Sequence, residues 1–162
     1  MSSNKKYANN IKLMSGSVNN DANHISGPSR TGEELFLVID KALTVAGVSA
    51  AAIDFISAHG TATIYNDEME AKAIALANLH NAPVNSMKAY FGHTLGAAGL
   101  LESVITIHSM QRNTVLSSLG FTNIGVTKPI NICNTLIHKP LDNCLKTASG
   151  FGGCNAAVVF SK

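Results

Sequence analysis

Two stretches of this chain decide what kind of fold and site it has: AHGTAT (Ala58–Thr63) and KAYFGHTLGAAG (Lys88–Gly99). The first brings His59 to the end of an apolar run, Ile53–Ala58, which predicts a buried β-strand. The second brings His93 close to the start of an apolar helix. Polar groups at strand ends and helix starts are where α/β proteins bind ligands and carry out chemistry. The two histidines are therefore the first candidates for a functional site.

Outward from these stretches, predicted strands alternate with predicted helices, which implies parallel βαβ units followed by a terminal hairpin. Gly47 is placed to cap the first helix at its C-terminus. We expect a single domain over residues 11–162 and a disordered tail over residues 1–10. Strands are expected over residues 11–17, 53–58, 84–87, 114–119, 135–138, 145–149 and 156–161, and helices over residues 32–46, 66–79 and 95–111.

The composition of the chain excludes several classes of protein. With 162 residues the chain is long enough for one domain with a real core, and its formal net charge of +2 comes with no cluster of lysine or arginine. We therefore expect no nucleic-acid partner. The longest apolar runs are too short to cross a bilayer, and no signal peptide is expected. The three cysteines fit no disulfide or zinc pattern, which favours a reducing, cytoplasmic setting without a bound metal.

Four stretches carry a more specific resemblance. In chain order they are Asp21–Pro28, similar to a DA-x-H-x-T-x-P loop; His59–Asp67, similar to HGTST followed by ND; Lys88–Gly99, similar to K-S-x-x-GH-x-x-GAAG; and Gly150–Asn155, similar to GFGGTN. These patterns belong to the β-ketoacyl-acyl-carrier-protein synthases, so nearly the whole chain resembles the C-terminal half of such a condensing enzyme. The resemblance implies an α/β fold, a three-layer thiolase-like half with a mixed sheet of about five strands and helices on both faces.

The resemblance also assigns roles to the histidines. The family decarboxylates a malonyl-type thioester and lets the resulting enolate attack an acyl group held on a cysteine. Two N–H donors stabilise the enolate oxyanion, each by about 3 kcal/mol by analogy with oxyanion-hole variants, and the matching residues here are His59 and His93. Lys88 matches the family lysine that pairs with a helix carboxylate, Glu102 in this chain, and we expect it to orient His93. A neutral ring is favoured for His93, because the adjacent helix N-terminus disfavours a positive charge.

Further matches concern substrate binding. Ser26, Thr61 and Thr63 match hydroxyls that hydrogen-bond the phosphopantetheine arm of the substrate in the family. Phe151 matches a residue that gates the acyl pocket and whose backbone N–H completes the oxyanion hole for the acyl thioester. Glu70 matches an acid near the active site, and we expect it to support the site from behind.

Expectations for cofactor and partners follow from the same resemblance. No cofactor is expected, since the substrates arrive on the phosphopantetheine of an acyl carrier protein. The family's nucleophilic cysteine belongs to an N-terminal half, and none of Cys133, Cys144 and Cys154 lies at a comparable strand-to-helix elbow. We therefore expect a partner that bears this cysteine, association into a dimer, and no condensing activity from these residues alone.

Two interpretations of the function stay open. The chain is either the C-terminal portion of a condensing enzyme, or a non-catalytic partner that binds acyl chains or the carrier protein or sets chain length. The presence of His59, Lys88 and His93 favours the enzyme, because a scaffold needs neither histidine. A thiolase-like or acyltransferase relative is disfavoured, because it lacks this pairing of HGT with GH-x-x-GAAG.

Overall fold

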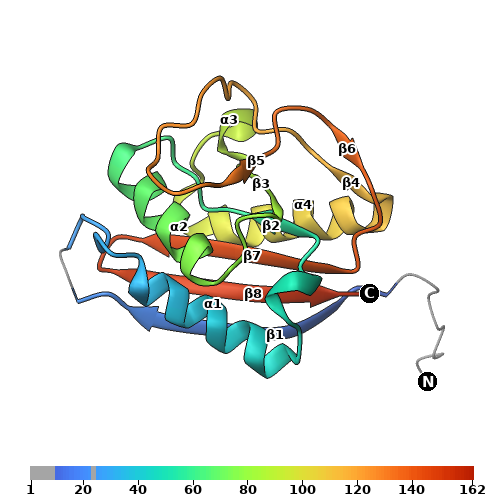
Figure 1. The fold of residues 1–162 in the computed structure, drawn as a ribbon, viewed down its shortest axis with the longest axis horizontal. Helices are drawn as coiled ribbons and strands as arrows, with labels where there is room; N and C mark the ends of the chain where they lie inside the picture. Colours follow the sequence, from blue (N-terminus) through green and yellow to red (C-terminus); the bar gives the residue numbers. More distant parts are fainter. Residues whose placement is uncertain (1–9, 23–24) are drawn as a thin grey trace.

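The computed structural model describes residues 10–22 and 25–162 (Figure 1). The disordered tail expected over residues 1–10 lies, apart from its last residue, outside this described part of the chain. Within residues 10–22 and 25–162, no helix combines the length and the apolar character needed to cross a membrane.

A mixed sheet forms the middle layer of the molecule. Its strands span Lys12–Asn20 (β1), Phe55–Ser57 (β2), Pro83–Asn85 (β3), Asn131–Ile132 (β5), Asn143–Gly150 (β7) and Cys154–Ser161 (β8). They form one six-stranded sheet in the order β1-β8-β7-β2-β3-β5. β7, β2, β3 and β5 run parallel, whereas β8 pairs antiparallel with both β7 and β1. The expected mixed sheet and terminal hairpin are confirmed. The strand that the sequence did not indicate is β5, whose two residues are too few to form an apolar run.

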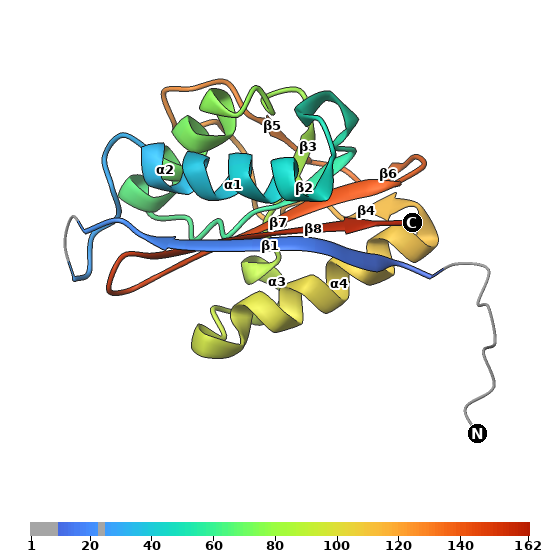
Figure 2. The same ribbon diagram turned by 90° about the horizontal axis from the view of Figure 1, so that it is seen from below.

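Helices cover both faces of this sheet (Figure 2). α1 (Glu33–Ala46) and α2 (Ile64–Leu76) lie on one face, and α4 (Ala98–Arg112) lies on the other together with the short α3 (Lys88–Phe91). Two 3₁₀ turns, Ala50–Ala52 and Leu95–Ala97, precede β2 and α4. The three-layer arrangement expected from the sequence is therefore present.

α1 packs on the sheet through one apolar stripe, as its helical spacing predicts. Gly32, just before the helix, has φ 76°, and a Cβ there would lie 2.6 Å from the carbonyl oxygen of Met69 on α2. Only glycine allows α1 to start this close to α2. Gly47 caps the other end in the left-handed conformation at φ 67°. The buried stripe consists of Leu35, Val38, Ile39, Ala42 and Leu43.

α4 has the opposite polarity, with polar side chains facing inward. Glu102, Thr106 and Ser109 are buried, whereas Leu100 and Val104 are 75% and 44% exposed. An apolar stripe that faces outward is unusual for a helix of a folded domain, since burial of that stripe normally holds such a helix in place. Here a buried ion-pair network, described below, and the burial of Met110 in a second apolar cluster hold α4 against the sheet, and Leu100 and Val104 are left open.

The segment that follows α4 differs from the prediction of a strand over residues 114–119. Only β4 (Thr114–Val115) forms, and it pairs with β6 (Ile137–His138) in a separate two-stranded sheet. Residues 116–130 form an irregular loop that folds back over α2. The backbone N–H of Thr127 donates to Glu68 Oε2 at 2.8 Å, and the Thr127 hydroxyl donates to Oε1. Side-chain hydrogen bonds of this kind, which hydrophobic patterns do not reveal, hold the loop in place.

Candidate functional site

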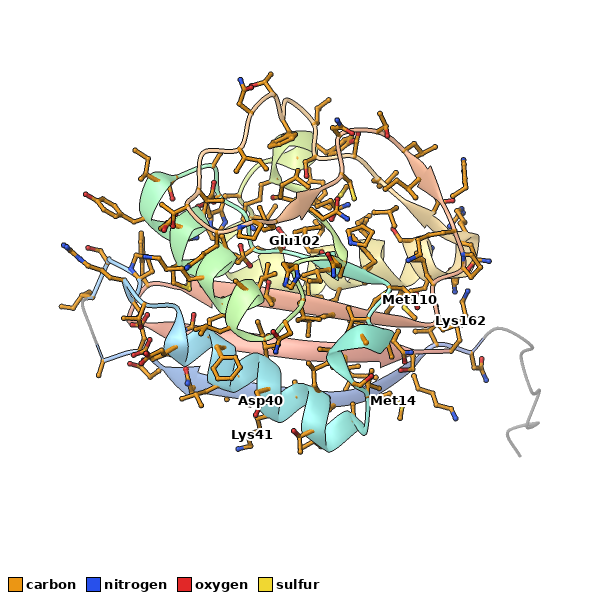
Figure 3. All side chains as sticks on the ribbon, in the orientation of Figure 1. Met14, Asp40, Lys41, Glu102, Met110 and Lys162 are labelled. Atoms are coloured by element: carbon orange, nitrogen blue, oxygen red, sulfur yellow. The ribbon has the colours of Figure 1, made fainter. Side chains whose placement is uncertain are left out.

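Neighbouring parallel strands deliver the candidate residues to one edge of the sheet. β2 ends two residues before His59, and the adjacent β3 leads into Lys88 at the start of α3. Glu102 reaches the same place from α4, on the far side of the sheet from α1. It lies deep inside the molecule, whereas Lys41 and Lys162 lie at the periphery (Figure 3). The site is therefore built where strand ends and the polar side of α4 meet.

The rings of His59 and His93 lie side by side. Their centroids are 5.2 Å apart and their planes are inclined by 78°. His59 is only 5% exposed, whereas the His93 side of the pair is open to solvent. The fold thus brings two imidazoles from separate loops into contact.

Hydrogen bonds decide which ring nitrogen carries the proton. The Lys88 ammonium, which can only donate, lies 3.3 Å from His59 Nδ1. The backbone N–H of Leu95 donates to His93 Nδ1 at 3.1 Å. In the neutral form of either ring Nδ1 therefore accepts, and the proton resides on Nε2. The N–H donor of each neutral imidazole is therefore its Nε2–H group.

Burial fixes the charge of His59. Desolvation, reinforced by the ammonium groups of Lys88 and Lys146, lowers the pKa of this imidazole to about 3. The ring is therefore neutral at physiological pH. A neutral donor can hydrogen-bond an anion without being a permanent cation.

Lys88 connects His59 with the buried carboxylate. Its Nζ lies 2.7 Å from Glu102 Oε1 and also donates to the backbone carbonyl of His59. The expected pairing with Glu102 is present. The expectation that Lys88 orients His93 has to be corrected, because the ammonium reaches His59 instead. The reason is topological: β3 lies beside β2, so the residue that follows β3 lands next to the loop that follows β2.

Sequence reasoning missed a second lysine in this network. Lys146, on β7, is 2% exposed, and its Nζ lies 2.6 Å from Glu102 Oε2. Burial lowers the pKa of Lys146, and the charge of Glu102 opposes that shift. The signal was present in the sequence as a charged residue inside the predicted strand over residues 145–149, a position that is costly without a partner if it is buried.

Glu70 holds the loop that carries His59. Its Oε1 accepts from the backbone N–H of His59 at 2.8 Å and from the hydroxyl of Thr147 at 2.6 Å, and its Oε2 accepts from the N–H of Gly60 at 2.8 Å. Asp67 takes the next N–H, that of Thr61, at 3.2 Å. Glu70 thus contacts the backbone of the site and not the imidazole, which matches a supporting position behind it.

A cleft of about 630 Å³ opens beside His93. Thr61 and Thr63 line it, with their hydroxyl oxygens 2.8 Å apart. The opposite wall comes from the irregular loop over residues 118–126, which sequence reasoning did not include in the site. The available signal was the run GFTNIGV, which places apolar side chains in a glycine-containing segment without helical spacing. The apolar lining contributed by this loop consists of Leu119, Phe121, Ile124 and Val126.

The structure does not bring Phe151 and Ser26 to this cleft. Phe151 lies in the turn between β7 and β8 and is 83% exposed. Gly152 in this turn has φ 82°, and its N–H donates to the carbonyl of Ile25 at 2.6 Å. Ser26 follows Ile25 in that same loop. These two residues are therefore neighbouring parts of the molecule, and their predicted roles in binding substrate stay predictions.

No thiol lines the cleft. Burial raises the pKa of the Cys133 thiol to about 11 and raises that of Cys144 further, whereas Cys154 is exposed at the start of β8. Low-pKa thiolates are the reactive form of cysteine, so the two buried thiols are inert. In the described part of the chain no group of three or more His, Cys, Asp and Glu side chains could hold a metal ion.

Comparisons with known proteins agree with this geometry. The family model described as "Beta-ketoacyl synthase, C-terminal domain" matches residues 12–122. The chain is 31% identical to the 3-oxoacyl-[acyl-carrier-protein] synthase 2 of Mycobacterium leprae, over 92% of this chain and 36% of that protein. It is 33% identical to the corresponding synthase 2 of Rhizobium meliloti, over 90% of this chain and 35% of that protein.

Solved structures show the same relationship. A β-ketoacyl synthase from Burkholderia phymatum superposes with a TM-score of 0.88 at 30% identity, over 94% of this chain and 37% of that one. The ketosynthase ApeO of Xenorhabdus doucetiae, solved in complex with its chain length factor ApeC, gives a TM-score of 0.81 at 33% identity, over 93% of this chain and 39% of the other. The chain thus spans about a third of the length of the relatives it matches. It belongs to the β-ketoacyl synthase family and carries the family's C-terminal domain.

Proposed function

We propose that this chain supplies the enolate-stabilising half of a decarboxylative condensing enzyme. The observation that carries the proposal is the pair of adjacent imidazoles, with ring centroids 5.2 Å apart and a hydrogen-bond donor at each Nδ1, which leaves the proton of the neutral ring on Nε2. When a malonyl-type thioester releases carbon dioxide, the electron pair of the broken C–C bond becomes an enolate. The enolate oxygen accepts hydrogen bonds from the Nε2–H groups of His59 and His93, which stabilise it in a site already organised for it.

The second half of the reaction needs a thiolate. The enolate carbon attacks the carbonyl of an acyl group bound to a cysteine, and the C–S bond breaks to release that thiolate. The three cysteines of this chain are either buried with raised pKa values or lie outside the cleft. We therefore propose that the acyl group is held by a cysteine outside these 162 residues, and that the chain alone does not condense thioesters.

The open side of α4 supports a partner that covers it. Leu100 and Val104 are exposed there although α4 is held in place by a buried charge network. An exposed apolar stripe of this kind marks an interaction surface. We propose that the cysteine-bearing half of the enzyme covers this stripe, and that acyl carrier protein delivers substrate to the cleft. One structural neighbour at 28% identity is a type II polyketide ketosynthase solved with its acyl-carrier protein, which is consistent with that delivery.

The test combines this chain with a cysteine-bearing N-terminal half of a related synthase. Purified halves are mixed with acyl- and malonyl-acyl carrier protein, and ketoacyl product on the carrier is measured by mass spectrometry. We expect product from the mixture but not from either half. His59→Ala and His93→Ala should each lower the rate by about a hundredfold or more, since each removes one oxyanion donor. His138→Ala, which changes an exposed histidine on β6, is the matched control.

A second function, that of a non-catalytic partner that sets chain length, is favoured by one finding. The Xenorhabdus neighbour is a ketosynthase solved in complex with its chain length factor, so a ketosynthase similar to this chain works with a partner of that kind. The same experiment separates the two functions. If product from the mixture is unaffected by His59→Ala and His93→Ala, the chain acts as a partner and not as the enolate-stabilising half.

A further inference from the structure

The Lys146 ammonium is enclosed by oxygen atoms. It lies 3.3 Å from the carbonyl oxygen of Ser57, 3.3 Å from that of Ala58 and 2.6 Å from Glu102 Oε2, and it also donates to the carbonyl of Thr147. The side chain crosses from β7 to the end of β2, where the sheet turns into the functional loop. Two of its partners are the two residues immediately before His59.

The charges around this ammonium balance. Lys88 and Lys146 share the single carboxylate of Glu102, one on each oxygen, at 2.7 and 2.6 Å. The second buried carboxylate, Glu70, contributes its charge to Lys146 and holds the backbone of His59 from the opposite side. A buried charge without compensation is strongly destabilising, so each member of such a cluster depends on the others.

Both lysines converge on His59 but hold different parts of it. Lys88 contacts the ring at Nδ1 and the carbonyl oxygen of His59 itself. Lys146 contacts the two carbonyl oxygens that precede this residue, and it binds the carboxylate that holds Lys88. Removal of Lys146 would therefore release the strand end and leave Lys88 as the one partner of Glu102.

We propose that Lys146 is a positioning residue, whose ammonium fills an oxygen cage at the end of β2 and thereby fixes the position and the tautomer of His59. The proposed function enters this proposal at one point only: it says what His59 is for, namely hydrogen bonding to the enolate oxygen. The placement itself can be measured without any condensing activity. A merely space-filling role would make Lys146 replaceable by an apolar side chain of similar length, with no effect on the imidazole.

The experiment uses the full chain with ¹⁵N-labelled histidine and follows the ring nitrogens by NMR as pH is lowered. In the unaltered protein we expect His59 to keep its proton on Nε2 and to titrate near the pKa of about 3 set by its surroundings. In Lys146→Met the loss of a neighbouring cation should move that midpoint up by about one pH unit or more. Lys41→Met, the same change at an exposed position on α1, should leave it where it is.

The double variant Lys146→Met with Glu102→Gln also removes the carboxylate that opposes the shift. Its midpoint should return toward the original value, because the charges of Lys146 and Glu102 act on His59 in opposite directions. A folded Lys146→Met chain with an unchanged His59 midpoint and tautomer would overturn the proposal, whatever the outcome of the condensation assay. In the unaltered chain, the expected His59 signals without ketoacyl product from the mixed halves would count against the proposed function and not against the role of Lys146.

If Lys146→Met does not fold, Lys146→Ala is examined in ammonium chloride and, at equal ionic strength, in choline chloride. A small ammonium ion can enter the vacated cage, whereas choline is too large. Recovery of the folded spectrum and of the Nε2–H signal of His59 in ammonium alone supports the proposal. Equal behaviour in both salts, including failure to fold in both, shows that Lys146 acts by packing and overturns it.

Discussion

At the scale of single residues, His59 illustrates how surroundings decide the charge of a side chain. An imidazole in water titrates near pH 6.5, but here burial and two nearby ammonium groups hold the pKa at about 3. Its hydrogen bond with Lys88 then selects which nitrogen keeps the proton. Position in the fold, and not residue type, makes this histidine a neutral donor.

The lowered pKa of His59 makes stability depend on pH. Between pH 6.5 and 3 the unfolded chain binds a proton at His59 and the folded chain does not, so the stabilisation is present above pH 6.5 and is lost as the pH falls. The free energy of unfolding should decrease by up to about 1.4 kcal/mol per pH unit from this group. Urea unfolding at pH 7 and at pH 5 measures it. The decrease should be smaller in His59→Asn, and an equal decrease in both proteins would refute the assignment.

Glu70 is the acceptor for three donors, so Glu70→Gln should destabilise the protein. One acceptor oxygen becomes an NH₂ group that faces an N–H or hydroxyl donor, and a buried donor is left unsatisfied. We expect a loss of about 1–3 kcal/mol in the free energy of unfolding. Chemical denaturation provides the measurement, with Glu33→Gln at an exposed position on α1 as control. A Glu70→Gln chain as stable as the control would contradict the clamping role.

At the scale of elements, glycines set how closely helices approach. α1 and α2 lie on the same face of the sheet, and the start of α1 runs against the backbone of α2. Gly32 and Gly47 both have positive φ, 76° and 67°, but only the first has close neighbours. Substitutions at these two positions can therefore distinguish the destabilisation caused by backbone strain from that caused by steric crowding.

Gly32→Ala should destabilise the protein more than Gly47→Ala. Both introduce a Cβ in the left-handed region, at about 1–2 kcal/mol each. At Gly32 the new Cβ would also lie 2.6 Å from the carbonyl oxygen of Met69, which adds about 1–3 kcal/mol of overpacking, whereas nothing lies within 4 Å at Gly47. Parallel thermal and urea unfolding of the two variants measures the difference. Equal losses would show that α1 and α2 can move apart at no cost.

At the scale of the whole molecule, the layers are unequally covered. α1 and α2 bury a continuous apolar core on one face of the sheet. On the other face α4 turns its polar side inward and its apolar side outward. In a domain arranged in this way the buried charged side chains pair with one another, but an exposed apolar surface remains that suits a partner.

The open stripe predicts self-association of the isolated chain. Leu100→Lys should lower the apparent mass in light scattering and reduce the binding of a hydrophobic dye, because it places a charge at the centre of the stripe. It should leave the free energy of unfolding nearly unchanged, since Leu100 is 75% exposed. Leu37→Lys, at a position 56% exposed on α1, is the matched control and should not alter association. A monomeric unaltered chain that binds no dye would contradict the prediction.

The sequence by itself determined the class of fold and the two segments that carry the histidines. Helical spacing and strand-like runs are local properties, so α1, the β7–β8 hairpin and the glycine at the end of α1 could be predicted from neighbouring residues. Motifs such as AHGTAT and KAYFGHTLGAAG also lie within one segment each, and they located His59, His93 and Lys88.

Tertiary structure alone decided which side chains meet. Lys88 lies next to His59 because β3 pairs with β2, and Lys146 reaches Glu102 because β7 pairs with β2 on its other side. Strand order is a non-local property that no spacing along the chain encodes. The same holds for the loop over residues 116–130, which hydrogen bonds to a distant carboxylate hold in place beside the cleft. Local pattern fixes the elements, whereas pairing between distant strands and side chains creates the site.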